Sequence, residues 1–414
     1  MAKELPLGVL AVDLGTSHVK MCVYSARTDT WEKVHAFRNK LYRVKESTIQ
    51  EIKDAGGDVD VAPGLYTPYD IGVLKSKAEE VAVLEDAWTK EPDLLRVSYI
   101  HVCQQADEVY GLTAKENLYG GSLLRPDVRN KWGIFATVTQ LKEDVSRTLL
   151  VDQHRQVAKD LNFAFFYSRP QTFLAIMANG ADVKKRSPSG SCTVIDIGGG
   201  DTKGFCLLAD KAGVVPLPET MVRQPLAGET IERRFMANLV PRAKGYKRPD
   251  KFLDHLYRYG RIKTLDESKS AFRSGEIPPI MLKSGSVALN VEDDDDFVPT
   301  MLFEPSKYGF HSEKGLHQII WDMIESAEQL DVEPVQLLKC VLLVGGTCQY
   351  PYMDVRLKEE IDKLWPDLAP EMSVIRAKDA QLSVVNGQRL ATRTIFRKHK
   401  EDGESFFKYF ETLN

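Results

Sequence analysis

Apolar residues along this chain form short blocks separated by glycine-containing turns. Residues 8–13 read GVLAVD, a turn LGTSH follows, and VKMCVYS completes a predicted β-hairpin. The same order recurs at 192–209, where CTVID, IGGGDT and KGFCLL follow one another. Two copies of one hairpin predict two lobes built on one plan.

Helical spacing of apolar residues separates the predicted strands. One predicted helix covers 141–161, another begins at Gln171 and stops at Asn179-Gly180, and a third covers 312–330. A buried strand is predicted at Val341–Val344. Strands that alternate with helices indicate an α/β fold in layers.

Three polar stretches are predicted to lie at the surface. Residues 50–75 are rich in Gly, Pro and Asp, which is typical of a mobile loop, and the apolar Leu65, Tyr66 and Tyr69 within it are candidate contact residues. The acidic run 292–296 is interpreted as a solvated loop, and the basic run 184–186 as a linker between the lobes.

Composition narrows the range of functions. A chain of 414 residues with 43% hydrophobic composition is long enough for two cores. Its 55 Lys+Arg against 59 Asp+Glu give a net charge of −4, which disfavours nucleic acid or an anionic membrane as the principal partner. Six scattered cysteines, no signal-peptide pattern and no long apolar run predict a cytoplasmic protein with reduced thiols.

The first glycine turn has the residues that phosphate binding requires. Gly15 lets backbone N–H groups approach an anion, and the hydroxyls of Thr16 and Ser17 add donors. Lys20 on the return strand can neutralise phosphate charge, and Asp13 can hold Mg²⁺ through water. An ordinary β-turn is the alternative interpretation.

The second turn strengthens this interpretation because successive glycines between buried strands cost entropy without a packing return. Close approach of the backbone to an anion explains them, and a β-bulge is the alternative. With the first hairpin, this turn would clamp a polyphosphate and its metal from two sides. Its candidate ligands are Asp196, Gly198, Gly199, Gly200, Asp201 and Thr202.

A third turn follows the strand Val341–Val344. Its glycines would let a flat base lie against the backbone, with Tyr350 over the base or ribose. A generic strand–helix loop is the alternative. The candidate residues are Gly345, Gly346, Thr347, Gln349 and Tyr350.

These three segments, in this order, resemble the phosphate-1, phosphate-2 and adenosine motifs shared by actins, Hsp70 chaperones and sugar kinases. Residues 161–180 resemble the actin segment whose helix begins with a water-positioning glutamine, here Gln171, and 225–231 resemble the actin segment beside the adenine, with Gly228 as the matching glycine. The stretches 301–320 and 376–391 also resemble actins. The similarity covers most of 8–26 and 134–395.

The resemblance implies a two-lobed actin-like, ribonuclease H-like α/β fold with a nucleotide cleft between the lobes. Lobe I would span 1–180, with an inserted subdomain at about 35–100; lobe II would span 181–378; and 379–414 would return to lobe I. It also implies a prokaryotic actin homologue that hydrolyses ATP to ADP with Mg²⁺ and polymerises into filaments, with regulatory proteins as further partners. The implied catalytic residues are Gln171, Asp196 and Asp13, with metal at the two aspartates and nucleoside contacts at Arg261 and Gln381.

The chain departs from the actin pattern at three of these positions. Lys203 stands where actins have a histidine, which favours retention of anionic phosphate. Gln381 replaces a lysine near the adenine, and Gly260 replaces a ribose-contacting glutamate.

Other members of the superfamily are the alternatives. A non-polymerising sugar-kinase-like enzyme shares the phosphate motifs but not the actin-like segments at 225–231 and 301–320. An Hsp70-type chaperone would need a further domain after the nucleotide lobes. A membrane-tethered division or assembly factor would use the aromatic tail 396–414 as its anchor, but the acidic residues in that tail favour packing on the body instead.

Overall fold

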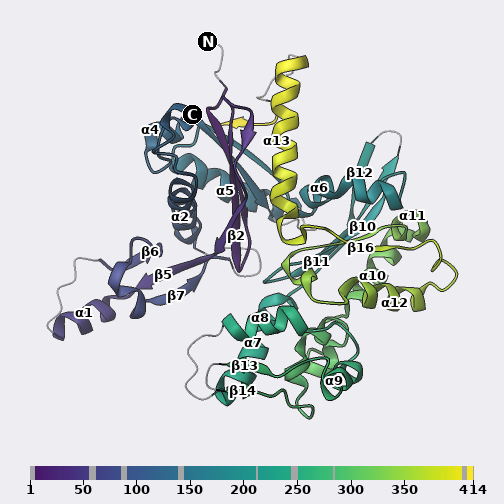
Figure 1. Ribbon diagram of the computed structural model, residues 1–414. Helices are drawn as coiled ribbons and strands as arrows, with labels where there is room; N and C mark the ends of the chain where they lie inside the picture. The colour runs from purple at the N-terminus through teal and green to yellow at the C-terminus, as the bar shows by residue number, and fades with distance from the viewer. Residues whose placement is uncertain are drawn as a thin grey trace. The chain divides into compact units, whose positions relative to one another are not determined.

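The computed structural model describes residues 5–55, 62–84, 91–138, 144–210, 213–243, 250–282, 285–402 and 408–413 (Figure 1). The chain divides into two compact units: unit 1 is Met1–Ala178 with Val384–Asn414, and unit 2 is Asn179–Ser383. Both units mix helices and strands, so the predicted α/β class is confirmed. The predicted lobe boundaries lie close to the limits of these units.

Unit 1 is built around one large sheet and one small sheet. Its elements are β1 (Gly8–Leu14), β2 (His18–Ser25), β3 (Thr30–Trp31), β4 (His35–Arg38), β5 (Lys40–Val44), α1 (Glu46–Asp54), β6 (Gly64–Tyr66), η1 (Gly72–Ser76), β7 (Glu79–Ala82), α2 (Pro92–Tyr110), α3 (Glu116–Tyr119), α4 (Pro126–Arg129), β8 (Trp132–Val138), α5 (Asp144–Asp160), β9 (Phe165–Pro170), most of α13 (Ser383–Asp402) and β17 (Glu411–Thr412). Helix α6 (Gln171–Arg186) begins in unit 1.

The large sheet of unit 1 has the order β17-β9-β8-β1-β2-β3, and β4 also pairs with β2. Strands β1 and β2 form the predicted hairpin, with Asp13 directly opposite Lys20. Strand β8 lies parallel to β1 on its other side, and β9 is parallel to β8. The carboxyl ends of β1, β8 and β9 therefore lie at one edge of the sheet, where α/β proteins place their ligands.

Successive side chains of β1 point to opposite faces of this sheet, and helices cover both faces. Leu10 and Val12 pack in the main core with Tyr99 of α2. Ala11 points to the other face and packs against Val385 of α13, the helix drawn in yellow beside β2 in Figure 1. Because both faces are buried, β1 is apolar almost throughout instead of alternating with polar residues.

The small sheet of unit 1 contradicts the prediction of a structureless loop at 50–75. Helix α1 extends to Asp54, and β6 pairs with β5, which also pairs with β7. Leu65 and Tyr66 are therefore half-buried strand residues, whereas Tyr69 is 43% exposed. The strand escaped detection because three residues are too few to show a period. The part of this prediction at 56–61 lies outside the described residues.

Unit 2 contains the second hairpin and a helical part. Its elements are β10 (Cys192–Ile197), β11 (Thr202–Asp210), β12 (Gly213–Gln224), α7 (Gly228–Leu239), η2 (Val240–Arg242), α8 (Asp250–Tyr259), α9 (Leu265–Arg273), β13 (Ile280–Leu282), β14 (Gly285–Val287), η3 (Asp294–Leu302), η4 (Pro305–Tyr308), α10 (Leu316–Glu328), α11 (Pro334–Leu338), β15 (Val341–Val344), η5 (Gly346–Gln349), α12 (Met353–Leu364), β16 (Val374–Arg376) and η6 (Ala380–Leu382).

The main sheet of unit 2 repeats the plan of unit 1. Its order is β12-β11-β10-β15-β16, with β10, β11 and β12 antiparallel and β15 and β16 added in parallel. Asp196 lies opposite Lys203 across the hairpin, as Asp13 lies opposite Lys20. The predicted hairpins, the strand at Val341–Val344 and the helix within 312–330 are confirmed.

One local prediction in unit 2 is wrong, and another, the solvated acidic run, fails at Asp296. Helix α6 continues past Gly180 to Arg186, so the basic run is the last turn of a helix, where cations are favourable, and not a linker. One glycine costs a helix only about 1 kcal/mol, which packing can offset.

In the acidic run, the side chain of Asp296 is fully buried, accepts a hydrogen bond of 2.7 Å from Asn238 and pairs with Arg242.

The aromatic tail packs on unit 1 where it is described. Phe396 and Phe410 are buried, and Phe410 contacts the rings of Phe135 and Tyr167. Phe406 and Phe407 lie outside the described residues. None of the described helices is long and apolar enough to cross a membrane. The six cysteines are buried and unbridged.

A close backbone contact in unit 1 generates a stability prediction. A Cβ atom on Gly387 of α13 would lie 2.0 Å from the carbonyl oxygen of Leu174, whereas a Cβ on Gly180 of α6 would meet nothing within 4 Å. We expect Gly387→Ala to lower the free energy of unfolding by about 1–3 kcal/mol through overpacking. Gly180→Ala, the matched helical control, should raise it by up to about 1 kcal/mol. Urea denaturation measures both, and an unchanged stability of Gly387→Ala would contradict the packing.

Candidate functional site

The carboxyl ends of three neighbouring parallel strands bring together the candidate residues of unit 1. Asp13 lies near the end of β1, Thr137 near the end of β8, and Gln171 directly after β9. Asp13 and Gln171 were predicted as site residues from separate segments of the sequence. Thr137 was not, because a single threonine in an apolar strand gives no signal of its own.

The carboxylate of Asp13 is the centre of this cluster. Its Oδ1 atom accepts hydrogen bonds of 2.8 Å from the Thr137 hydroxyl and 2.8 Å from the Gln171 side-chain amide. Its Oδ2 atom lies 3.1 Å from the Lys20 ammonium. Asp13 is only 1% exposed, so a charged carboxylate at this depth requires these donors.

The donors decide the ionisation of Asp13. Burial by itself would raise its pKa, but Lys20, Thr137 and Gln171 together outweigh burial and hold the pKa below its ordinary value. The carboxylate is therefore charged at neutral pH.

The first glycine turn is closed by Asn39, a residue that the sequence did not single out. The Asn39 side chain donates 2.7 Å to the Gly15 carbonyl, and its backbone N–H donates 2.9 Å to the Ser17 carbonyl. Burial, followed by nearby cations, lowers the pKa of His18 to about 4, so its 3.1 Å contact with the Ser17 hydroxyl is that of a neutral ring at pH 7. Thr16 is half-buried beside them.

In unit 2, three predicted segments meet at one carbonyl group. The Gly198 carbonyl accepts 3.1 Å from the Gly228 N–H and 2.7 Å from the Thr347 hydroxyl. A Cβ atom on Gly228 would lie 2.4 Å from that hydroxyl oxygen, so only glycine fits there. The second glycine turn, the start of α7 and the third turn thus form one site.

Gly345 is a second position in this site where glycine is required. Its φ angle is +93°, and a Cβ atom would lie 2.3 Å from the Ile197 carbonyl oxygen and 2.6 Å from Asp196 Oδ1. The third turn therefore lies so close to the end of β10 that no Cβ atom fits between them. The half-buried Gly199 accepts from the Glu229 N–H at 2.8 Å, which joins the turn to α7, and Gly200 is also half-buried.

A row of alternating charges crosses the sheet at this turn. Lys203 lies 3.4 Å from Asp196 Oδ2 and 3.5 Å from Asp201 Oδ1, and Arg223 donates 2.7 Å to Asp201 Oδ2. Register explains the row, since Lys203 faces Asp196 on one side and Arg223 on the other. Burial alone would raise the pKa of Asp201, but Lys203 and Arg223 outweigh it and lower the pKa. Thr202 donates its hydroxyl 2.7 Å to the Leu226 carbonyl.

The predicted nucleoside residues are only partly brought together. Gln349 and Gln381 are 3.4 Å apart and line an open hollow of about 510 Å³, a size that suits a ligand. Tyr350 is fully buried and stacks on Tyr257 at 5.0 Å, so its ring is used within the core. Arg261 pairs with Glu276 instead.

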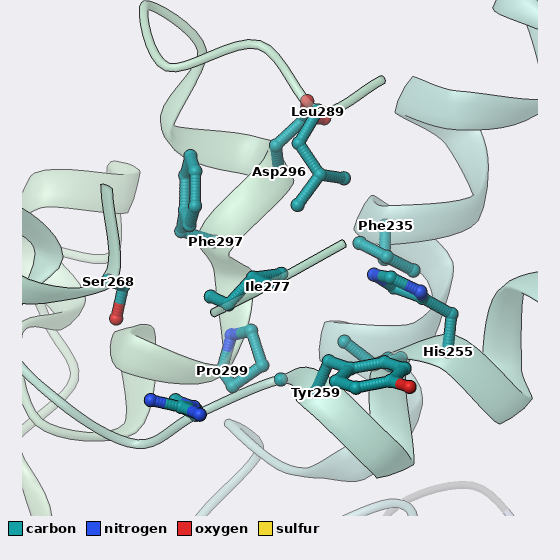
Figure 2. Close-up of a pocket in the computed structure, with 12 residues that line it drawn as sticks. Phe235, His255, Tyr259, Ser268, Ile277, Leu289, Asp296, Phe297 and Pro299 are labelled. Carbon is teal, nitrogen blue, oxygen red and sulfur yellow. The ribbon is translucent and has the colours of Figure 1, made fainter. Parts of the chain in front are cut away.

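Arg261 also lines a second cavity of unit 2, shown in Figure 2. Most of its walls are apolar, including Phe235, Ile277 and Phe297, and His255 and Ser268 lie on opposite sides of it. Its volume of about 20 Å³ holds little more than one water molecule. We therefore assign it no ligand.

The predicted magnesium ligands do not fit direct metal coordination. Asp13 uses both oxygens for side-chain donors, and Asp196 faces the Lys203 ammonium. Among the residues that the structure describes, no group of three or more His, Cys, Asp or Glu side chains is placed to bind a metal ion.

Comparison with known proteins adds no assignment. No protein-family model matches the chain, and a search of curated proteins found no match to it.

The Asp13 cluster predicts a pH-dependent effect of one hydroxyl. Because the folded-state pKa of Asp13 is lowered, the carboxylate stabilises the fold above about pH 4, and this stability is lost as the pH falls through the folded-state pKa. Thr137→Val should raise that pKa and lower the free energy of unfolding at pH 7 by about 1–3 kcal/mol. Chemical denaturation at several pH values should show that the difference in the free energy of unfolding between wild type and variant becomes smaller below about pH 4.

Thr193→Val is the matched control for this prediction. Thr193 is a buried strand threonine whose hydroxyl donates 3.3 Å to the neutral Leu337 carbonyl. Its destabilisation should not change with pH. A Thr137→Val effect that is equally constant would show that the hydroxyl does not act through the Asp13 charge.

Proposed function

We propose that this chain is an actin-like ATPase with the two-lobed, ribonuclease H-like fold, in which each unit contributes one phosphate-binding hairpin, and that it assembles into filaments. One observation carries the proposal. Both units have a sheet in which an antiparallel hairpin is extended by two parallel strands, and in both an Asp near the end of the first strand faces a Lys on the second.

Backbone geometry supports phosphate as the ligand. Both glycine turns follow buried strands, and each presents an ammonium group, since Lys20 Nζ would lie 3.6 Å from a Cβ atom on Gly15 and Lys203 is bound at the second turn. Backbone N–H groups at a tight turn beside a fixed ammonium are a site for anions. The open hollow beside Gln349 and Gln381 could receive the nucleoside portion.

Gln171 supports hydrolysis as the reaction. Its side-chain N–H donates to Asp13, which directs its carbonyl oxygen away from the carboxylate. A carbonyl oxygen held in this way accepts a hydrogen bond from a water molecule and orients it for attack on the terminal phosphate. The charged Asp13 fixes the glutamine and does not itself need to take a proton.

The two alternative functions would use the same phosphate site but differ in the acceptor of the phosphate or in the role of the tail. A sugar-kinase-like enzyme would transfer the phosphate to a sugar hydroxyl instead of water, and a membrane-tethered factor would bind lipid through the tail. Phe396 and Phe410 are buried in unit 1, which argues against lipid binding through these residues and against a free tail.

Hydrolysis is tested with Gln171→Ala. We expect the variant to bind ATP with a Kd close to that of the wild type and to turn over roughly 100-fold more slowly, because the water loses its orienting group. Calorimetry with a non-hydrolysable ATP analogue and phosphate release measure the two effects. Gln104→Ala, which removes a glutamine that donates 3.0 Å to Asp70 elsewhere in unit 1, should behave as the wild type. A folded wild-type chain that binds no ATP would refute the proposal.

Assembly is tested by sedimentation and electron microscopy. We expect the wild type to pellet with ATP above a critical concentration. Tyr69, one of the three candidate contact residues predicted within 50–75 and the most exposed of them, is the residue to test. Tyr69→Ala should raise the critical concentration about tenfold or more, since burying a large apolar side chain contributes about 1.5–3 kcal/mol. Val109→Ala, at a similarly exposed position on α2, is the control. A chain that stays monomeric with ATP at all salt concentrations is not a filament protein.

A further inference from the structure

Both carboxylates predicted to hold magnesium already face a lysine of the same hairpin. Lys20 lies directly opposite Asp13, at 3.1 Å, and Lys203 directly opposite Asp196, at 3.4 Å. In an antiparallel pair, residues in register are held together by the strand hydrogen bonds, so these contacts are part of the fold. Positive charge is thus built into each glycine turn.

Lys203 is the more deeply placed of the two. Its side chain is 8% exposed, against 17% for Lys20, and it bridges two carboxylates where Lys20 meets one. An ammonium this far from water requires such partners, and each carboxylate in turn requires the ammonium.

Arg223 lets Lys203 give up its contact with Asp201 without leaving that carboxylate unpaired. The Arg223–Asp201 contact is 2.7 Å, whereas the Lys203–Asp201 contact is 3.5 Å. An incoming phosphate oxygen can therefore contact the Lys203 ammonium, which keeps its place beside Asp196, while Arg223 continues to neutralise Asp201. The flexible four-carbon chain of lysine allows such a movement within the site.

We infer that Lys203 supplies, at the second hairpin, the positive charge that a divalent cation would otherwise bring to the phosphates, so that this chain binds a nucleoside triphosphate with little dependence on divalent metal. The inference rests on the proposed function, because it assumes that the hairpins bind ATP. It concerns the binding of the nucleotide and not its hydrolysis.

Calorimetry with the non-hydrolysable ATP analogue, in excess Mg²⁺ and in excess EDTA, tests this inference. For the wild type, the Kd should rise by less than about tenfold when EDTA replaces Mg²⁺. For Lys203→Met, which keeps the length of the side chain and removes its charge, the Kd should rise by more than about 100-fold on the same exchange. A Kd ratio that Lys203→Met leaves unchanged overturns the role of Lys203.

Two further variants complete the experiment. Lys185→Met removes an exposed lysine that pairs with Asp182 in the same unit, and it should keep the wild-type ratio. Lys203→Arg keeps the charge and should stay tolerant of EDTA. If Lys203→Met does not fold because Asp196 loses its cation, the wild-type ratio decides, and a rise above about tenfold in EDTA overturns the inference. Loss of binding by the wild type in both buffers would instead refute the proposed function, whereas a wild type that binds in Mg²⁺ but much more weakly in EDTA refutes this inference and leaves the proposed function standing.

Discussion

A charged carboxylate buried in an apolar sheet must be surrounded by donors, and at Asp13 that requirement ties together four elements of unit 1. Lys20 comes from β2, Thr137 from β8 and Gln171 from the first turn of α6. A one-residue slip of the hairpin would move Lys20 to the other face of the sheet, and a shift of β8 would remove the hydroxyl. An unpaired carboxylate at this depth would cost several kcal/mol, so the register and the parallel pairing depend on one another through this group.

Unit 2 meets the same requirement with different chemistry. Where Asp13 is bound by one cation and two neutral side chains, Asp196 and Asp201 share Lys203, and Asp201 also pairs with Arg223. Neutral donors bind a carboxylate without adding charge, whereas the paired cations of unit 2 keep a positive group ready at the glycine turn. The two hairpins therefore share a backbone plan but differ in electrostatics. This difference is the basis for our proposal that the first hairpin helps to orient water and that the second neutralises phosphate.

Close backbone contacts explain why glycine occupies the ends of these strands. Gly228 and Gly345 each approach a neighbouring segment to a distance that excludes a Cβ atom. Thr347 and Gly228 both donate to the Gly198 carbonyl, so the second turn is held by the rest of unit 2. A turn fixed in this way loses little entropy when a ligand binds, which is an advantage for a binding site.

Local sequence determined the hairpins, the buried strand at Val341–Val344 and the Asp–Lys pairs, because strand period and a tight turn settle which residues lie opposite one another within a few positions. It also placed Gln171 at the start of a helix, although where that helix ends depended on packing that offsets the cost of Gly180. Thr137, Asn39 and Arg223 were decided only by tertiary structure, since each reaches its partner through a strand pairing or loop contact that the chain makes elsewhere. Asp296 has the sequence pattern of a solvated acid, but in the structure Arg242 and Asn238 bind its carboxylate. The physical reason is common to all four: a polar side chain has the same local pattern whether water or a distant donor satisfies it, and only the folded chain determines which of the two it meets.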